Sequence, residues 1–299
     1  MTEIDIAAVE RRLTDVIDAV GPMIVAFSGG VDSSLLALAA HRVLGDRMVA
    51  ATADSASLAT GELEQCRELA ARWSIPWIAV ATDELSDDRY VANNSDRCYW
   101  CKSALMDQLT DYADRAAQAG GTPMTITLGV NVDDLGDHRP GQEAAASRGA
   151  RFPLVEADLA KADIRALAKH WGLEVWDRPA MPCLSSRLPY GTAVSVPLLS
   201  KVDRAEAGLR DLGFTDVRVR HYDDTARIEL PAAEMAAAVE RAEELVAAVT
   251  GAGYRYVTLD LAGLRSGNLN HSVTSPSRVD QRGAEPGPTS RVDAAPVKR

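Results

Sequence analysis

The sequence has little of what membrane, secreted and nucleic-acid-binding proteins need. None of its apolar stretches approaches the ~18–20 residues that span a bilayer, and the acidic N-terminal segment lacks the apolar core of a signal peptide. We therefore expect a cytoplasmic protein with no membrane partner. Lysine and arginine number 32 against 43 acidic residues, a net charge of −11 over 299 residues. This balance disfavours nucleic acid as a partner and favours a small-molecule substrate.

Cysteine is also scarce, since four residues are too few for a disulfide scaffold. In a reducing compartment such cysteines more often bind metal or do chemistry. Cys98 and Cys101 form a CxxC motif, which suits a shared metal or a redox pair but also occurs incidentally. Cys183 lies in a polar, proline-flanked loop beside Arg187, which favours a thiolate. Cys66 lies in a helical apolar stripe and is expected to pack in the core.

The three cysteines outside that stripe are one ligand short of a closed tetrahedral zinc site. They suit an iron–sulfur cluster with one iron left open, which can carry an extra sulfide. Zinc with His41, His138 or Cys66 as a fourth ligand is the alternative.

Strands and helices alternate over the first 178 residues. The apolar runs predicted as strands are Met23–Phe27, Met48–Thr52, Trp77–Val80 and Thr125–Val130. The helices predicted from apolar spacing are residues 3–20, Leu35–Leu44, Glu62–Trp73, Lys102–Ala117 and Lys161–Trp171. This order predicts an α/β domain over residues 1–178, with a parallel sheet and helices on both faces.

Prolines break the pattern after residue 178, and a second unit follows. Its predicted elements are a helix at Leu198–Leu212, strands at Val217–His221 and Ala226–Leu230, a helix at Ala232–Val249 and a strand at Tyr254–Asp260. We expect a smaller α+β domain over residues 179–270, with the first two strands forming a hairpin turned at 223–225. Residues 271–299 have almost no large apolar side chains and are expected to be a disordered tail.

A glycine-rich loop follows the first strand directly. Gly29 and Gly30 let the backbone approach phosphate oxygens, at a point where a helix N-terminus presents free N–H groups. Ser28 and Ser33 add hydroxyl donors, and Asp32 can hold Mg²⁺ against the phosphates. The loop lacks the Gly-Lys-Ser/Thr ending of a Walker A motif and the glycine spacing of a dinucleotide fingerprint. The alternative is an ordinary Gly-Gly turn ahead of a capped helix.

A second polar segment closes the strand Thr125–Val130. Asn131, Asp133 and Asp134 emerge at the carboxyl edge of the sheet, where open α/β sheets bind ligands. The two carboxylates either hold Mg²⁺ or form an Asp-rich turn and helix cap.

The loop Ser28–Ser33 resembles the PP-loop (N-type ATP pyrophosphatase) superfamily, whose members cleave ATP to AMP and pyrophosphate. The resemblance implies an adenine nucleotide alpha hydrolase-like fold, with pyrophosphate on this loop, Asn131 near the nucleotide and Asp54 facing the adenosine. Longer segments resemble one PP-loop family, the ATP-dependent sacrificial sulfur transferases called LarE. These segments are Ala26–Leu36, Asn131–Gly141, Pro179–Gly191, Val217–His221 and Asp260–Gly267.

This resemblance implies a role in the biosynthesis of the nickel-pincer nucleotide cofactor. ATP and Mg²⁺ would adenylate the carboxylates of pyridinium-3,5-biscarboxylic acid mononucleotide, and sulfur would then convert them to thiocarboxylates. Some members sacrifice a single cysteine, whereas others are thought to use a cluster-bound sulfide. The set Cys98, Cys101 and Cys183 favours a four-iron four-sulfur (4Fe-4S) cluster, with Cys183 and Asp32 as catalytic residues. The resemblance also implies a homo-oligomer.

The second domain is expected to hold the anionic groups of the substrate. Arg187, Arg218 and Arg220 are the candidates, because guanidinium groups bind phosphate and carboxylate bidentately. Arg218 and Arg220 are two residues apart on a strand and so share one face. Glu206 either holds a metal, orients an arginine or is an ordinary surface carboxylate, and Ser186 is a further contact candidate. The alternative for each arginine is a solvated surface charge.

Three rival functions remain at this stage. A tRNA 2-thiolation enzyme also combines a PP-loop with three cysteines, but it needs an RNA-binding face. A synthetase of the GMP or NAD class would leave Cys183 without a role. A nucleotide sensor on a degenerate PP-loop would bind ATP without turnover.

Overall fold

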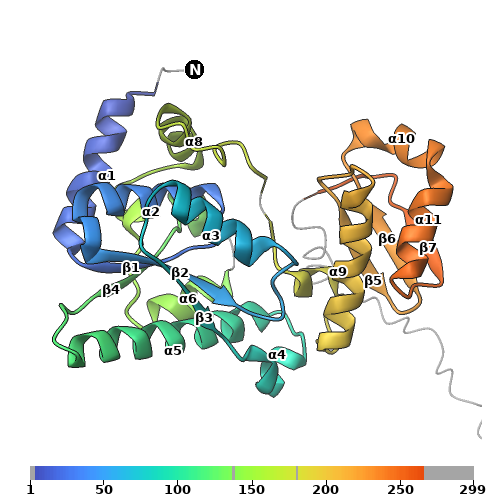
Figure 1. Ribbon diagram of the computed structural model, residues 1–299, viewed down its shortest axis with the longest axis horizontal. Helices are drawn as coiled ribbons and strands as arrows, with labels where there is room; N and C mark the ends of the chain where they lie inside the picture. The colour runs from blue at the N-terminus through green and yellow to red at the C-terminus, as the bar shows by residue number, and fades with distance from the viewer. Residues whose placement is uncertain (1–3, 137–138, 180, 266–299) are drawn as a thin grey trace, which may run out of the picture. The chain divides into compact units, whose positions relative to one another are not determined.

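A computed structural model describes residues 4–136, 139–179 and 181–265 of the chain. Its larger sheet has four parallel strands in the order β3-β2-β1-β4 (Figure 1). The strands are β1 (Met23–Ala26), β2 (Met48–Asp54), β3 (Trp77–Ala81) and β4 (Thr125–Leu128). In the centre of the sheet Met23 pairs with Met48 on one side and with Thr125 on the other. Parallel neighbours require crossover connections, and helices supply them here.

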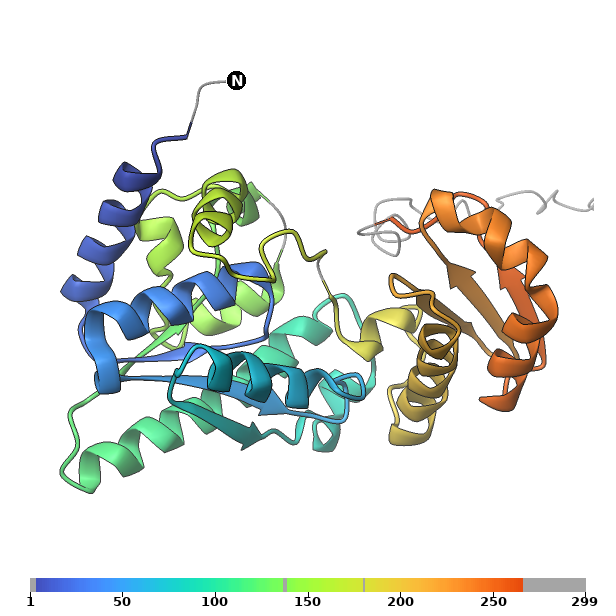
Figure 2. The same cartoon turned by 45° about the horizontal axis from the view of Figure 1, so that its top comes forward.

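Helices cover both faces of this sheet (Figures 1 and 2). The longer ones are α1 (Ile6–Val20), α2 (Val31–Leu44), α3 (Glu62–Arg72), α5 (Arg97–Gln118) and α8 (Lys161–His170). Shorter ones are α4 (Asp88–Val91), α6 (Pro140–Ala146) and α7 (Pro153–Glu156). Val25 of β1 packs into a core formed with α1, α2, α3 and α8. Its neighbour Ile24 packs instead against Leu105 and Leu109 of α5. Because alternate strand residues point to opposite faces, both faces are buried, and the predicted α/β sheet is confirmed.

Helix α5 begins five residues earlier than the apolar spacing predicted, at Arg97 rather than Lys102. Its first turn has no apolar periodicity, and the start is marked only by Asp96 at the N-cap, which makes no side-chain capping bond. The consequence is that Cys98 and Cys101 lie one turn apart on a helix and share a face. Helix α6 packs closely here, because a Cβ on Gly141 would lie 3.2 Å from the carbonyl oxygen of Cys98.

The smaller sheet has three strands in the order β5-β6-β7. These are β5 (Arg218–Tyr222), β6 (Thr225–Glu229) and β7 (Tyr256–Leu259), with β5 antiparallel and β7 parallel to β6. Tyr222 pairs with Thr225 across a two-residue turn, in which Asp223 adopts a left-handed conformation with φ 50°. The predicted hairpin is therefore confirmed.

The helices of this part are α9 (Val196–Asp211), α10 (Met235–Glu240) and α11 (Ala242–Gly251). The single helix predicted over Ala232–Val249 is wrong, because the segment breaks at Arg241. The Arg241 guanidinium donates to the carbonyl of Leu212 at 2.7 Å and to the carboxylate of Glu244 at 2.8–3.0 Å. These bonds hold its backbone outside the helical region, with φ −104° and ψ 26°.

Each sheet has its own buried core of apolar side chains. The domain boundaries 1–178, 179–270 and 271–299 stay predictions, and the predicted tail lies outside the described residues, as does His138. In the described part of the chain, no helix is both long and apolar enough to cross a membrane.

Candidate active site

The glycine-rich loop joins β1 to α2 and is held by its own serines. The Ser28 N–H donates to Ser33 Oγ at 3.2 Å, and the Ser33 hydroxyl donates to the carbonyl of Gly30 at 3.1 Å. Gly29 has φ +70°, a conformation that side-chain-bearing residues rarely adopt. Beneath it lies the predicted core residue Cys66, which is 3% exposed, and burial raises the pKa of its thiol. These hydrogen bonds fix the conformation of the loop, and the first N–H groups of α2 lie at its end.

The end of β4 passes directly against this loop. A Cβ on Gly129 would lie 2.8 Å from the backbone nitrogen of Ser33, so only glycine allows the approach. Two residues later the buried Asn131 donates from Nδ2 to Asp32 Oδ1 at 3.2 Å. Three of the predicted nucleotide-binding residues, Ser33, Asp32 and Asn131, therefore lie together at the carboxyl edge of the sheet.

A lysine that the sequence analysis did not identify completes this edge. Lys161 Nζ lies 2.5 Å from Asp32 Oδ2, and its backbone N–H donates to Asp133 Oδ2 at 2.7 Å. Lys161 is the first residue of α8, far along the chain, and nothing in its local sequence signals chemistry. Only the fold brings its charge to the phosphate loop.

The predicted magnesium ligands differ in how well they fit a metal ion. Asp133 and Asp134 accept backbone N–H bonds from Lys161 and Asn131, and Asp134 also pairs with Arg139 at 2.8 Å. These are the contacts of a turn and a helix cap, the alternative that the sequence left open. Asp32 fits best, because it lies on the phosphate loop and only side chains hold it. Across the residues that the structure describes, no group of three or more His, Cys, Asp or Glu side chains is arranged to hold a metal ion.

Asp54 ends β2 and is exposed at the same edge of the sheet. Its carbonyl accepts from the Thr82 N–H at 3.0 Å, which leaves the carboxylate outside the strand ladder. The position agrees with a contact to the nucleoside, and that role stays a prediction.

The three candidate sulfur residues come from two places in the fold. Cys98 and Cys101 lie on the first turns of α5, and Cys183 precedes the 3-10 turn Leu184–Arg187. Burial, together with the charges of Cys183, Glu84 and Cys98, raises the pKa of Cys101 to about 12. Burial acts to lower the pKa of Arg97, but Cys183 and Cys98 outweigh it and raise that pKa. Each effect requires proximity, so the three thiols share one region although they do not form a ready-made ligand group.

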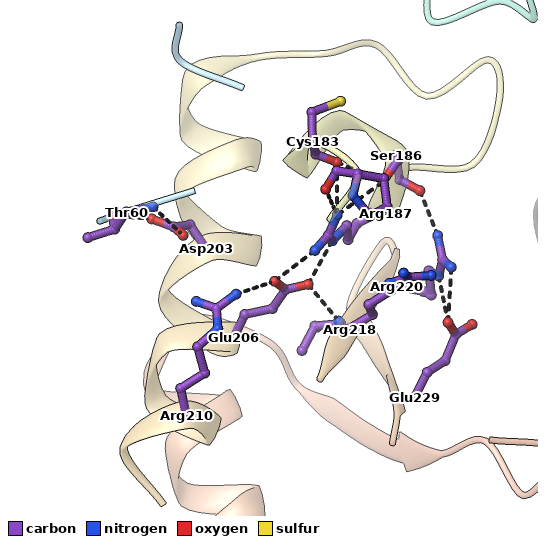
Figure 3. Close-up of polar contacts among 12 residues, drawn as sticks. Thr60, Cys183, Ser186, Arg187, Asp203, Glu206, Arg210, Arg218, Arg220 and Glu229 are labelled. Atoms are coloured by element: carbon purple, nitrogen blue, oxygen red, sulfur yellow. Dashed lines mark hydrogen bonds and ion pairs between the residues drawn. The ribbon is translucent and has the colours of Figure 1, made fainter. Parts of the chain in front are cut away.

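A buried ion-pair network lies under the Cys183 loop (Figure 3). Arg187, only 6% exposed in its side chain, donates from Nε and Nη2 to the fully buried Glu206 at 2.8 and 3.1 Å. Glu206 also accepts from Arg210 at 2.8 Å and from the Val219 N–H at 3.0 Å. Arg187 Nη1 donates to the carbonyl of Cys183 at 3.0 Å, while the thiol points away from the network in Figure 3. Arg187 therefore holds the backbone of the Cys183 loop.

The two arginines of β5 lie beside this loop. Arg220 pairs with the buried Glu229 at 3.0 Å and donates to the carbonyl of Ser186 at 2.7 Å. Burial, followed by the positive charges of Arg187 and Arg220, lowers the pKa of Arg218. A guanidinium whose charge is disfavoured in this way gains from a bound anion. Glu229 was not identified from the sequence, because a single glutamate on a strand has no distinguishing spacing.

Comparisons with known proteins show which proteins the chain is similar to. No model of a known protein family matches the chain. An uncharacterized protein from Synechocystis is 46% identical over 84% of this chain and 92% of its own length. The pyridinium-3,5-bisthiocarboxylic acid mononucleotide synthase of Lactiplantibacillus plantarum is 39% identical over 84% of this chain and 89% of its own length. A glutamine-hydrolyzing GMP synthase chain of Methanocella arvoryzae is 27% identical over 62% of this chain and 59% of its own length.

The parallel sheet, the serine-closed glycine loop at its carboxyl edge and the likeness to GMP synthase define a PP-loop protein of the ATP pyrophosphatase class. Within that class, the chain belongs to the family of the pyridinium-3,5-bisthiocarboxylic acid mononucleotide synthases, the LarE family.

Proposed function

We propose that this protein is an ATP-dependent sulfur transferase of nickel-pincer nucleotide biosynthesis. It adenylates the carboxylates of pyridinium-3,5-biscarboxylic acid mononucleotide and converts them to thiocarboxylates. The observation that carries the proposal is the pairing of two features in one chain of this family. One is a phosphate loop with Asp32 and Lys161 beside it, and the other is a cysteine loop set among buried arginines.

Adenylation follows from the first feature. A substrate carboxylate oxygen attacks the α-phosphorus of ATP, the bond to the bridging oxygen breaks, and pyrophosphate leaves with both electrons. Backbone N–H groups at the start of α2, the hydroxyls of Ser28 and Ser33, and Lys161 stabilise the leaving charge. Asp32, with Asn131 orienting it, would hold Mg²⁺, which neutralises phosphate charge when bound.

Substrate binding follows from the second feature. Arg218 and Arg220 share a strand face, with Ser186 beside them. Arg218 binds the phosphate or carboxylate groups, while the donors of Arg220 are used by Glu229 and by the carbonyl of Ser186. Arg187 and Glu206 act behind them, since the donors of Arg187 are used by Glu206 and by the loop backbone. They position the loop rather than contact the substrate.

Sulfur transfer takes place at Cys183. Sulfur attacks the acyl carbon, the C–O bond to AMP breaks, and AMP leaves as the phosphate anion. A bound 4Fe-4S cluster would supply the sulfur as sulfide, with Cys98, Cys101 and Cys183 as its ligands. The donor set fits this chemistry in kind, since Cys183 and Cys98 lie near the buried guanidinium of Arg97, which favours anionic sulfur. Burial raises the pKa of Cys101, so that thiol gives up its proton only when it binds the cluster. The less favoured route takes the sulfur from Cys183 itself and leaves dehydroalanine.

Pyrophosphate release with the biscarboxylic nucleotide, measured anaerobically, tests the function. We expect release in the wild type and its loss in Asp32→Ala, with an unchanged circular dichroism spectrum. Wild-type protein that binds ATP but releases no pyrophosphate would instead favour a nucleotide sensor.

Mass spectrometry of the protein after turnover tests the sulfur source. An intact Cys183 with more than one thiocarboxylate per chain supports the cluster route. Loss of one H₂S from Cys183 per thiocarboxylate, retained in Cys98→Ser, would establish the sacrificial route instead.

A further inference from the structure

Among the described residues, Arg97 is a buried cation without a carboxylate partner. It is the first residue of α5, directly before Cys98, and only 5% of it is exposed. Within the described ranges no Asp or Glu oxygen lies at ion-pair distance from its guanidinium. Buried charges are ordinarily paired, so the groups that Arg97 contacts instead indicate which role it has in the fold.

Its hydrogen bonds join two segments that both carry candidate sulfur residues. Arg97 Nη1 donates to the carbonyl of Ser185 at 2.7 Å, two residues beyond Cys183. Its Nη2 lies 4.0 Å from Cys98 Sγ on its own helix. One side chain therefore connects the helix of the CxxC motif to the loop of Cys183.

Asn93 extends this connection to the far end of the same loop. Arg97 Nη1 donates to Asn93 Oδ1 at 2.6 Å, which turns the amide nitrogen of Asn93 toward the loop. That nitrogen donates to the carbonyls of Pro189 and Thr192 at 2.8 and 2.9 Å. Asn93 is fully buried with φ 53°, a strained conformation that these bonds maintain.

Neutral hydroxyls support the near end of the loop but do not replace the arginine. Ser185 Oγ lies 2.6 Å from Tyr90 Oη and donates to Ser57 Oγ at 3.1 Å. These bonds fix a side chain, and the Leu184 N–H donates to the carbonyl of Ser57 at 2.9 Å. Arg97 adds the bond that ties the backbone of this loop to α5.

We propose that Arg97 is a positioning residue that fixes the loop of Cys183 against the first turn of α5, so that the thiols of Cys183 and Cys98 adjoin. The geometric claim stands by itself. Its catalytic consequence rests on the proposed function, because an acyl-adenylate must meet sulfur at this place.

The geometric claim is tested by cross-linking the reduced, metal-free protein with a short bis-alkylating reagent. A Cys101→Ser background removes the competing bridge within the CxxC motif, and peptide mapping identifies the Cys98–Cys183 bridge. We expect Arg97→Met to slow bridging about tenfold, as expected for loss of hydrogen bonds from a charged group, and Arg97→Lys to recover part of it. Arg115→Met, an exposed arginine of the same helix, is the matched control. A rate in Arg97→Met within twofold of its parent, or no bridge in the parent, would overturn the proposal.

The catalytic consequence is tested by the yield of thiocarboxylate per pyrophosphate released. In Arg97→Met we expect an unchanged KM for ATP and near-normal pyrophosphate release with a severalfold lower thiocarboxylate yield. A merely destabilised protein would lose both in proportion, and that result would count against a positioning role. If the wild type releases no pyrophosphate, the proposed function fails, and the cross-linking result still decides the geometric claim.

Discussion

Glu206 shows how one buried residue can connect several parts of a candidate site. Its fully buried carboxylate accepts from Arg187, Arg210 and the Val219 N–H. The first of these bonds reaches the Cys183 loop, and the last reaches the strand that carries Arg218. A single carboxylate therefore sets the distance between the cysteine and the arginines.

Replacing Glu206 by glutamine should destabilise the protein by about 3 kcal/mol, because it leaves the buried charge of Arg187 uncompensated. Urea unfolding measures the loss. Asp211→Asn, at an exposed position near the end of the same helix, is the control and should change little. A loss below ~1 kcal/mol would mean that the network is not strongly coupled.

His221 should make stability depend on pH. It is 6% exposed beside Tyr254, and burial, followed by the charge of Lys201, lowers its pKa. Below the ordinary histidine pKa of about 6.5, the unfolded chain therefore binds more protons than the fold. The free energy of unfolding should fall as the pH drops below that value.

The comparison of His221→Gln with wild type between roughly pH 5 and pH 7 checks this contribution. The variant should show a shallower slope in denaturant titrations, whereas His170→Gln, at an exposed position, should keep the wild-type slope. Equal slopes in all three proteins would contradict the expectation.

Among the elements, the end of β4 lies in close contact with the start of α2 at the proposed nucleotide site. Gly129→Ala places a methyl group 2.8 Å from the Ser33 nitrogen and 3.0 Å from the Asp32 carbonyl carbon, so backbone must move. We expect about tenfold weaker ATP binding by calorimetry, with destabilisation of about 1–3 kcal/mol. Gly136→Ala has nothing within 4 Å of the new methyl and should bind ATP normally. Equal affinities in the two variants would show that the close approach is unimportant.

The elements also mark what sequence could and could not predict. Buried runs such as Met23–Phe27 predicted the strands well, because a strand covered on both faces must be continuously apolar. The early start of α5 was missed because its first turn lacks apolar periodicity. The break at Arg241 was missed because it depends on a bond to the distant carbonyl of Leu212. Lys161 and Arg97 were missed as site residues for the same reason. Each has an ordinary local sequence, and only tertiary packing brings its charge to a phosphate loop or a thiol.

At the scale of the whole molecule, the acidic net charge favours the proposed small-molecule substrate over an RNA substrate. With a net charge of −11 it should not retain bulk tRNA in filter binding at moderate salt, since too few phosphate contacts would release counterions. An acidic protein of similar size is the control, and low salt gives the upper limit of nonspecific binding. Retention that resists moderate salt would support the tRNA 2-thiolation hypothesis.

The homo-oligomer stays a prediction. Analytical ultracentrifugation, which measures the mass of the particle in solution, tests it.

The hydrogen bond from Arg187 to the Cys183 carbonyl bears on what happens when the sulfur of Cys183 is modified. The loop is fastened through main-chain oxygens, by Arg187 at Cys183 and by Arg97 at Ser185, and the sulfur atom supports none of these bonds. Oxidation, alkylation or outright removal of that sulfur therefore leaves these backbone hydrogen bonds in place. A molecule whose sulfur has been damaged or spent should keep the main-chain conformation of this loop.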